Sequence, residues 1–284
     1  MSTTYFEFMK QLIEAFIHPA HGISFIDHGG YESRSESTMA LFRAAFDLIG
    51  DKSRIRANHF YINTDDVSSK INDKLTFGYT MADDVVPCPD FIFDKYVECG
   101  IDSYEDTVSR IIDKGDKGYS INKLFWTGNL NTQPLRYQLY QLGSLHRDRM
   151  EIIPMDWERI APKGRRHNYT SYTSPDDQTR YKYLIDCGAR GYSGRVKLLL
   201  HSNRPVFLVD RHRNKQEFFY RHLVPFEHYI PVNEDLSNLL SQLDWAEENY
   251  DRARVIAQNA RKFALEYLNK KHAINYLCTV LQQS

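Results

Sequence analysis

Residues 181–210 read YKYLIDCGARGYSGRVKLLLHSNRPVFLVD, two apolar runs separated by a glycine-rich segment and a further apolar run. The runs at 183–187 and 206–209 are short and bounded by glycine or proline, as expected for buried strands. Residues 196–201 are apolar and compatible with a helix, which Asn203-Arg204-Pro205 would end. The segment therefore predicts a β-loop-α-β unit.

The loop of this unit contains Gly188, Gly191 and Gly194. A glycine-rich loop before a helix exposes backbone N–H groups at the positive end of the helix dipole and so favours an anion. Ser193 and Arg195 add a hydroxyl and a guanidinium that suit phosphate oxygens. The pattern is neither the dinucleotide fingerprint nor a P-loop, because GARGYSG has the wrong spacing and no Gly-Lys-Ser/Thr follows. A diphosphate cradle and an ordinary αβ turn with polar surface residues both stay open.

Composition restricts the class of protein. The chain has 284 residues, 42% hydrophobic and 26% charged, which is typical of a soluble globular protein with one large or two medium domains. The formal net charge of −1 gives no reason to expect a nucleic-acid partner. The four cysteines are far apart and form no CxxC pair, which favours reduced thiols in a cytoplasmic protein. The N-terminal run MSTTYFEFMKQLIEAFIH has acidic residues and no small-residue cleavage site, so we expect no secretory signal.

The first part of the chain alternates helical and extended patterns up to residues 114–117, a charged, glycine-bearing segment that is the best linker candidate. We therefore expect a first α/β domain over residues 1–117. Its predicted elements are an amphipathic helix at 4–18, a turn-rich segment at 24–31, a helix that Ser35 or Ser37 caps and that runs to 49, a strand at 55–62, strand or loop segments at 75–79 and 90–93, and a helix at 104–112.

A second α/β run predicts a domain over residues 118–268, and the remaining helical segment, 269–284, is expected to pack back on the first domain. Besides the unit at 181–210, the predicted elements are a strand at 123–126, a helix from a Thr132 cap to 142, a strand at 150–154, a helix from an Asp235 cap to 243, and helices at 251–268 and 273–281. The polar loop at 161–178 has a basic cluster at 163–167, which could hold an acidic partner or be a plain exposed loop.

Asp66 is a candidate catalytic residue because it ends a strand-like run, and ligands of open α/β sheets bind at the carboxyl ends of strands. It could act as a general base, or it could be a turn aspartate. The sequence has no Asp-x-Asp and no His/Cys cluster with zinc spacing, so we expect no metal site. Arg195 and Arg136 would then meet the charge of a leaving diphosphate. No hydrolase signature is present.

Several segments resemble glycosyltransferase family 90, which includes protein O-glucosyltransferases, fungal capsule-associated proteins and bacterial lipopolysaccharide-modifying enzymes. The resemblance is carried by residues 181–210, EFFYRHLVPFEHYIPVNEDLSNLL and DRARVIAQNARKFALEYL. FWTGNLNTQPLR is similar to the family's Phe-Arg-Gly…Thr-x-Pro-x-Arg, YINTDD to its Asn-x-x-Asp strand end, and ESRSESTM to its Ser-Arg segment. These segments cover most of the chain in the expected order.

The resemblance implies a GT-B architecture, in which two Rossmann-like domains face each other across the active-site cleft. Residues 1–117 would form the acceptor-side domain and residues 118–268 the nucleotide-sugar-binding domain. It further implies a UDP-sugar donor, inversion at the anomeric carbon, and no required metal or other cofactor.

By motif position, Asp66 falls on the family's catalytic base, which would deprotonate an acceptor hydroxyl. Contacts to the donor nucleotide fall on Gly128, Thr132, Arg136, Ser193, Gly194, Arg195, Glu217, Phe218 and Phe219. Arg34 matches the first-domain arginine, and Arg34 and Asp65 are substrate-binding candidates. The chain departs from the pattern in two ways: Trp126 or Thr127 replaces the arginine of Phe-Arg-Gly, with one residue inserted before Thr132, and Asp65 replaces a basic residue, so that two carboxylates compete as the base.

The expected function is transfer of glucose or a related hexose from a UDP-sugar to a hydroxyl of a cell-surface glycan, such as the lipopolysaccharide core. A UDP-xylose-dependent enzyme and a catalytically inactive nucleotide- or glycan-binding protein are the alternatives. The short chain, without a signal or retention sequence, resembles bacterial-type or viral members. We expect it in the cytoplasm, with peripheral membrane contact through 163–167.

Overall fold

A computed structural model of the chain describes residues 11–18, 22–155 and 172–284. The basic cluster predicted at 163–167 lies outside these residues. By its internal contacts the chain divides into two units. Unit 1 comprises Met1–Tyr96, His212–Arg221 and Asn269–Ser284, and unit 2 comprises Val97–Arg211 and His222–Leu268. This division is interleaved along the chain, whereas the predicted domains are contiguous.

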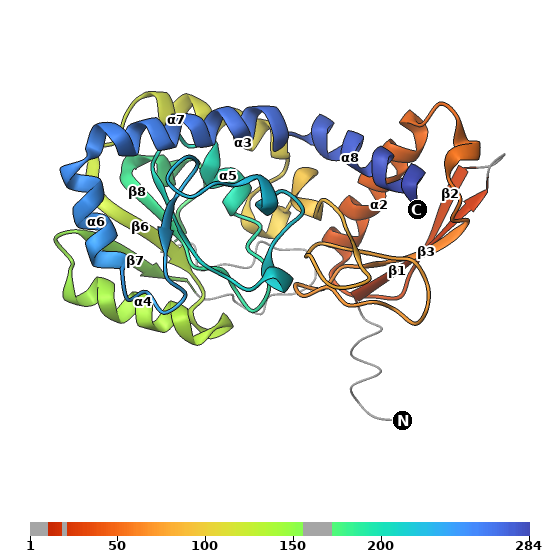
Figure 1. The fold of residues 1–284 in the computed structure, drawn as a ribbon, viewed down its shortest axis with the longest axis horizontal. Coiled ribbons are helices and arrows are strands. Elements are labelled where there is room, and N and C mark those ends of the chain that lie inside the picture. Colours follow the sequence, from red (N-terminus) through yellow and green to blue (C-terminus); the bar gives the residue numbers. More distant parts are fainter. Residues whose placement is uncertain (1–10, 19–21, 156–171) are drawn as a thin grey trace. The chain divides into compact units, whose positions relative to one another are not determined.

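Unit 1 contains a mixed sheet with two helices (Figure 1). The sheet has the order β2-β1-β3-β4-β5; β1 is antiparallel to both neighbours, and β3, β4 and β5 are parallel. Phe42 of α2 packs against Phe60 and Phe77 of the sheet, and Cys278 of α8 contacts Ala45 of α2. The elements are β1 (Leu12–His18), β2 (Gly22–Asp27), α2 (Glu32–Leu48), β3 (His59–Asn63), β4 (Thr76–Gly78), β5 (Val86–Pro87) and α8 (Lys270–Gln283).

The helix predicted at 4–18 is wrong for residues 12–18, which form β1; residues 4–10 lie outside the described part. Ile13, Ala15 and Ile17 are buried in alternation, as in a strand, and β1 is paired on both sides. The first half of the predicted turn-rich segment, 24–27, belongs to β2, which pairs with β1, and only 28–31 lie outside it. The segment at 90–93 forms a 3₁₀ turn, and most of the predicted linker at 114–117 belongs to a helix.

The first helix of unit 1 also begins earlier than predicted. It starts at Glu32, so that Ser35 and Ser37 lie buried inside it and cap nothing.

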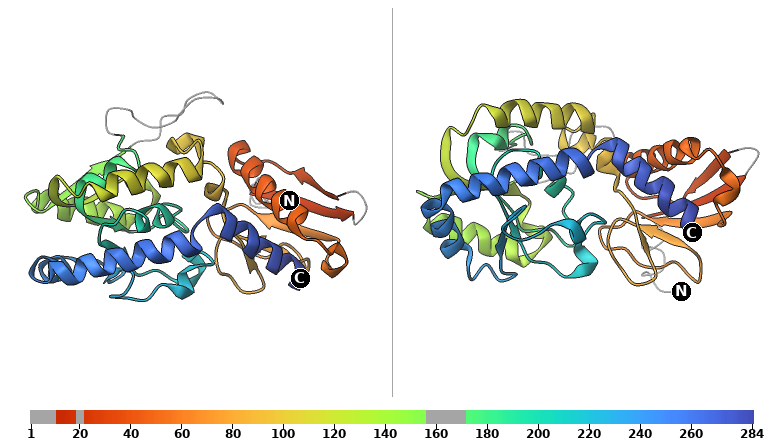
Figure 2. Two further views of the ribbon diagram at one scale, coloured as in Figure 1. Left: turned by 90° about the horizontal axis from the view of Figure 1, so that it is seen from above. Right: turned by 45° about the horizontal axis from the view of Figure 1, so that its top comes forward.

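Unit 2 is a doubly wound α/β unit (Figures 1 and 2). Its sheet has the order β10-β9-β8-β6-β7, and every neighbouring pair is parallel. Buried residues of α4, α6 and the start of α7 pack on one face of this sheet. The elements are α3 (Tyr104–Asp116), β6 (Ile121–Gly128), α4 (Pro134–Leu145), β7 (Met150–Pro154), β8 (Tyr181–Asp186), α5 (Val196–Leu200), β9 (Val206–Val209), β10 (Ile230–Val232), α6 (Leu239–Glu248) and α7 (Tyr250–Tyr267).

The parallel sheet confirms the predicted α/β class, and the strands at 150–154 and 206–209 have the predicted bounds. Two predicted caps are wrong. Helix α4 follows Gln133, while the Thr132 hydroxyl donates to the Asn129 carbonyl at 3.1 Å. Helix α6 follows Asn238, and the Asp235 carboxylate accepts from the Ser237 N–H at 2.9 Å.

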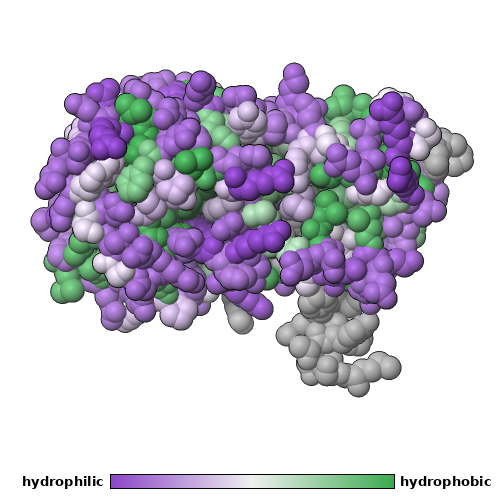
Figure 3. All heavy atoms as spheres, in the orientation of Figure 1, coloured by the Kyte–Doolittle hydropathy of each residue, from purple (hydrophilic) through white to green (hydrophobic). Residues whose placement is uncertain are grey.

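Short 3₁₀ turns connect these elements. They are η2 (Lys52–Arg54), η3 (Phe91–Phe93), η4 (Val97–Cys99), η5 (Leu130–Thr132), η6 (Asp177–Arg180), η7 (Arg213–Lys215) and η8 (Tyr220–His222). Hydrophilic side chains cover most of the face drawn in Figure 3. Among the described helices, none combines the length and apolarity that crossing a membrane requires.

Candidate functional site

The strand order of unit 2 locates a candidate site. Taken in chain order from β6, the strands are arranged 2-1-3-4-5, so the connections reverse direction between β6 and β8. In open parallel sheets, ligands bind outside the carboxyl ends of the strands at such a switch point. Here those ends carry Gly128 of β6 and Asp186 of β8, and the predicted glycine loop follows Asp186.

Asp186 organises this edge of the sheet, and sequence reasoning missed it. The carboxylate is fully buried; Oδ1 accepts from the Ser193 hydroxyl at 2.7 Å, and Oδ2 accepts from Arg211 Nη2 at 2.6 Å and from the Gly188 N–H at 3.1 Å. Arg195 Nε lies 3.6 Å from Oδ1. Burial alone would raise the pKa of Asp186, but the Arg211 and Arg195 guanidiniums and the hydrogen bonds hold it below the ordinary value.

The glycine loop is fixed from both sides. Gly188 has a φ of +73°, which an L side chain rarely adopts, so glycine is needed there. Its carbonyl accepts from Arg136 Nε at 2.7 Å, and its N–H is held by Asp186. The Gly194 carbonyl accepts from Lys197 Nζ at 3.1 Å. Because α5 has only five residues, side chains rather than a long helix dipole supply the positive charge here.

Two arginines lie against the ring of Trp126. The guanidinium carbons of Arg136 and Arg195 are 5.3 and 5.5 Å from the ring centre. Arg195 Nη1 donates to the Thr127 carbonyl at 2.5 Å, and Arg136 Nη1 donates to the Asn129 carbonyl at 3.0 Å. Burial, together with the charge of Arg195, lowers the pKa of Arg136 to about 10. Arg136 donates to two neutral carbonyls, and Arg195 has one neutral carbonyl besides the Asp186 carboxylate, so the pair can attract a further anion.

Unit 1 holds the candidate base. Arg34 Nη1 donates to Asp66 Oδ1 at 2.9 Å, and the Asp66 side chain is one-third exposed. The Arg34 guanidinium carbon lies 4.7 Å from the ring centre of Tyr31 and 4.9 Å from that of Phe91. These contacts fix the arginine that orients Asp66.

The neighbouring carboxylate has a different environment. Asp65 Oδ1 accepts from the backbone N–H of Asp66 at 2.6 Å, and the Asp65 N–H donates to Asn63 Oδ1 at 2.9 Å. The Asp65 carboxylate is therefore turned toward the backbone at the end of β3. Its Oδ1 therefore helps to stabilise the turn, and a role for Asp65 in substrate binding stays a prediction.

Glu217, Phe218 and Phe219 belong to unit 1. Phe218 packs against Phe93 and Tyr276, with ring centres 6.0 and 4.6 Å apart. All three side chains are buried, and the two phenylalanines contribute to the core of that unit. The structure thus groups Gly128, Arg136, Ser193, Gly194 and Arg195 in unit 2, with Thr132 on the turn after β6, and groups Arg34, Asp65 and Asp66 in unit 1.

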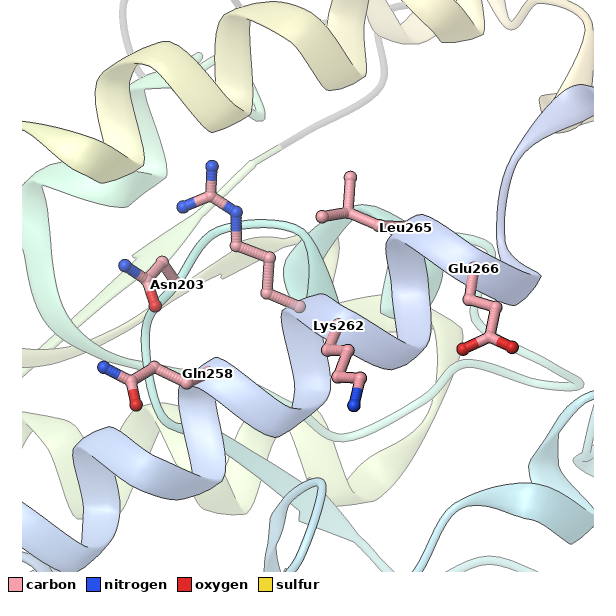
Figure 4. A pocket seen from close by; sticks show the side chains of 6 residues that line it. Asn203, Gln258, Lys262, Leu265 and Glu266 are labelled. Atoms are coloured by element: carbon pink, nitrogen blue, oxygen red, sulfur yellow. The ribbon is translucent and has the colours of Figure 1, made fainter.

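A hollow beside α7, lined also by Asn203, is a weaker candidate (Figure 4). Asn203 lies in the turn before β9, toward the amino ends of the strands and away from the glycine loop. Arg261 is already paired with Asp116, its Nη2 lying 3.1 Å from Oδ2. The lining residues are Asn203, Gln258, Arg261, Lys262, Leu265 and Glu266. Within residues 11–18, 22–155 and 172–284, no group of three His, Cys, Asp or Glu side chains could hold a metal ion.

Known proteins match this chain over parts of their length. A protein of Invertebrate iridescent virus 6 named Uncharacterized protein 179R is 30% identical over 125 residues, 42% of this chain and 10% of that protein. Protein O-glucosyltransferase 1 of Bos taurus is 39% identical over 92 residues, 32% of this chain and 23% of that protein. The chain therefore matches less than a quarter of either relative. The crystal structure of Anabaena Alr3699/HepE in complex with UDP aligns with 62% of this chain and 45% of that one, with a TM-score of 0.39 and 11% identity.

The sequence profile of glycosyl transferase family 90 matches residues 60–284, most of the chain. The match includes Asp66, the turn after β6 and the whole glycine loop. It confirms the resemblance inferred from the sequence. The chain belongs to glycosyl transferase family 90.

Proposed function

We propose that this protein transfers a sugar from a UDP-sugar to an acceptor hydroxyl. The observation that carries the proposal is the pair Arg136 and Arg195 beside Trp126 at the switch point of unit 2. Arg136 bonds to the Gly188 carbonyl and Arg195 to the Thr127 carbonyl, with Asp186 3.6 Å from Arg195, at the edge where parallel sheets bind ligands. Such a pair suits the diphosphate of a nucleotide sugar.

The arginines would also stabilise the leaving UDP, and this supports a reaction that requires no divalent metal. Fixed guanidiniums act on developing charge without having to reorganise, and losing one such donor typically lowers a rate by about 10²–10³. Asp186 and Arg211 would keep the loop in shape, while Arg195 reaches the ligand. The side chain of Arg195 is one-quarter exposed, whereas that of Arg211 is 6% exposed. This difference supports a ligand-contacting role for Arg195 and a structural role for Arg211.

We further propose that Asp66 is the general base of an inverting transfer. It would remove the proton of the acceptor hydroxyl, whose oxygen then forms a bond to the anomeric carbon as UDP leaves from the opposite face. Arg34 would hold the carboxylate in position through Oδ1. The proposal includes a GT-B arrangement, in which unit 1 supplies the base and unit 2 the donor site.

Glucose is the first candidate for the transferred sugar, because several relatives, including the bovine one, are named protein O-glucosyltransferases. Xylose is the alternative, and the two donors differ by one hydroxymethyl group, a difference that pocket shape decides. For the acceptor, we propose a cell-surface glycan such as the lipopolysaccharide core. A family member that binds nucleotide or glycan without catalysis is the second candidate function; UDP binding without turnover on any donor would favour it.

The proposal is tested by calorimetric titration with UDP, GDP and CMP, with a chelator present throughout. We expect UDP to bind selectively without metal. Absence of UDP binding, or binding only with a divalent ion, would contradict the donor assignment.

The base is tested with Asp66→Asn, which should fold and bind UDP but lose transfer by about 10²–10⁴-fold. Asp65→Asn is the matched control, since its carboxylate faces the backbone, and it should keep most activity. Wild-type turnover in Asp66→Asn would refute the assignment of the base.

A further inference from the structure

Two buried polar atoms without partners lie at the end of β6. They are the indole Nε1 of Trp126 and the hydroxyl of Thr127, and within the described part of the chain neither has a hydrogen-bond partner. Trp126 is 1% exposed and Thr127 is 4% exposed. A buried donor left unpaired is costly, so native proteins keep few of them, and each calls for an explanation.

Both residues lie at the anion-binding edge. The six-membered ring of Trp126 is turned toward Gly128, where an added Cβ would lie 2.8 Å from Trp126 Cζ2 and 3.1 Å from Arg195 Nη2. The edge of the indole nearest Nε1 therefore borders the last residue of β6 and the Arg195 guanidinium. Thr127 is joined to the same arginine, because its carbonyl accepts from Arg195 Nη1.

Two guanidinium groups lie beside these donors. Arg136 and Arg195 both lie within 5.5 Å of the Trp126 ring centre. Within the described residues no protein acceptor pairs with the Trp126 N–H, whereas a bound anion would satisfy the N–H and lie against both guanidiniums. Neighbouring residues of a strand point to opposite faces of the sheet. A ligand that lies across the carboxyl edge of the sheet can accept from both.

We propose that Trp126 Nε1–H and the Thr127 hydroxyl are ligand-binding donors that complete the diphosphate site with Arg136 and Arg195. This inference rests on the proposed function, since the ligand is the diphosphate of the UDP-sugar. The indole N–H and the hydroxyl each donate to a diphosphate oxygen. The ligand reaches the indole past Arg195, the partly exposed member of the site. Trp126 and Thr127 would thereby donate hydrogen bonds to the diphosphate at the position where the family's pattern has an arginine.

The experiment measures UDP affinity of the whole protein by calorimetry in wild type, Trp126→Phe and Thr127→Val. Phenylalanine keeps an aromatic ring but removes the N–H, and valine keeps the shape of threonine without the hydroxyl. Trp245→Phe is the matched control, because that indole also has an arginine, Arg252, at 5.6 Å from its ring but lies in α6. Thermal unfolding without ligand checks that each variant folds.

We expect Trp126→Phe to weaken UDP binding about tenfold or more, the effect of a lost hydrogen bond to a charged group. Thr127→Val should weaken it as well, and Trp245→Phe should bind like wild type. The ratio of UDP to GDP affinity should not change, because both nucleotides share the diphosphate.

The two hypotheses fail in different ways. If wild type does not bind UDP, the proposed function is wrong. If wild type binds UDP and both Trp126→Phe and Thr127→Val bind it equally well, only this inference is overturned. A loss of UDP-over-GDP selectivity in Trp126→Phe would likewise overturn it, by assigning the indole to the base. If Trp126→Phe does not fold, Thr127→Val alone decides the outcome.

Discussion

Asp186→Asn tests whether the buried carboxylate holds the glycine loop. Both oxygens of Asp186 accept hydrogen bonds, Oδ1 from Ser193 and Oδ2 from Arg211 and the Gly188 N–H. An asparagine of the same shape has one acceptor oxygen and one amide nitrogen. Whichever way the amide turns, the nitrogen faces a donor, and Arg211, with a side chain that is 6% exposed, loses its counter-charge.

The magnitude follows from this geometry. Removing one partner of a buried ion pair costs about 3–5 kcal/mol, because the remaining charge is left uncompensated. The Ser193 hydroxyl can rotate and accept from the new amide, so we expect the lower end, about 3 kcal/mol. The folded-state pKa of Asp186 is depressed, so its stabilisation is present above the unfolded-state pKa of about 4 and is lost as the pH falls toward the folded-state pKa.

The assay is urea unfolding followed by circular dichroism, at pH 7 and near pH 3. Asp244→Asn is the matched control: Asp244 pairs with Arg149 at 2.7 Å but is 57% exposed, and its loss should cost less than about 1 kcal/mol. We expect Asp186→Asn to have a lower urea midpoint than wild type at pH 7, and the difference between the two midpoints to be smaller near pH 3. Equal midpoints for the two variants at pH 7, or a gap that persists undiminished near pH 3, would refute the reasoning.

Two further predictions concern backbone space and pH. Gly128→Ala should lower the free energy of unfolding by about 1–3 kcal/mol in denaturant titration, because the added Cβ would lie 2.8 Å from the Trp126 ring. Gly50→Ala is the control, since an added Cβ there has no atom within 4 Å. An equal loss of stability in both variants would contradict this prediction. Burial lowers the pKa of His201 to about 4, below its value of about 6.5 in the unfolded chain. The contribution of neutral His201 to the free energy of unfolding is therefore fully present above pH 7. About 3 kcal/mol of it should be lost as the pH drops from 6.5 toward 4. His201→Gln should flatten this slope in urea midpoints measured against pH, and an unchanged slope would exclude His201 as its cause.

The sequence predicted those elements whose pattern is local. The strands at 150–154 and 206–209 are short apolar runs between turn signals, and the structure has them with the same bounds. Residues 12–18 fit a helical period as well as an alternating one, and only pairing with β2 and β3 decides for the strand. The interleaved units could not be predicted either, since the tertiary packing of Phe218 against Tyr276 assigns the segment 212–221 to unit 1.

The candidate site was predicted only where its residues are close together in the sequence. Ser193, Arg195 and the glycine loop are adjacent in sequence and could be recognised together. Asp186 and Arg211 are 25 residues apart, and nothing local indicates that they meet. The one available signal for Asp186 was a carboxylate that ends an otherwise apolar strand, where a charge is costly unless it is paired.

The arginines at this edge can be sorted by what neutralises them. Arg211 is buried against Asp186 at 2.6 Å, so its charge is cancelled within the protein and its role is to fix the loop. Arg136 bonds to the Gly188 and Asn129 carbonyls, which orient its charge without cancelling it. Arg195 lies between these cases, 3.6 Å from Asp186 and partly exposed. The positive potential is therefore concentrated at Arg136 and Arg195, on either side of Trp126. Asp186 offsets only part of the charge of this pair, and two guanidiniums held together repel each other, so the arrangement supports the proposal that they bind an anionic ligand.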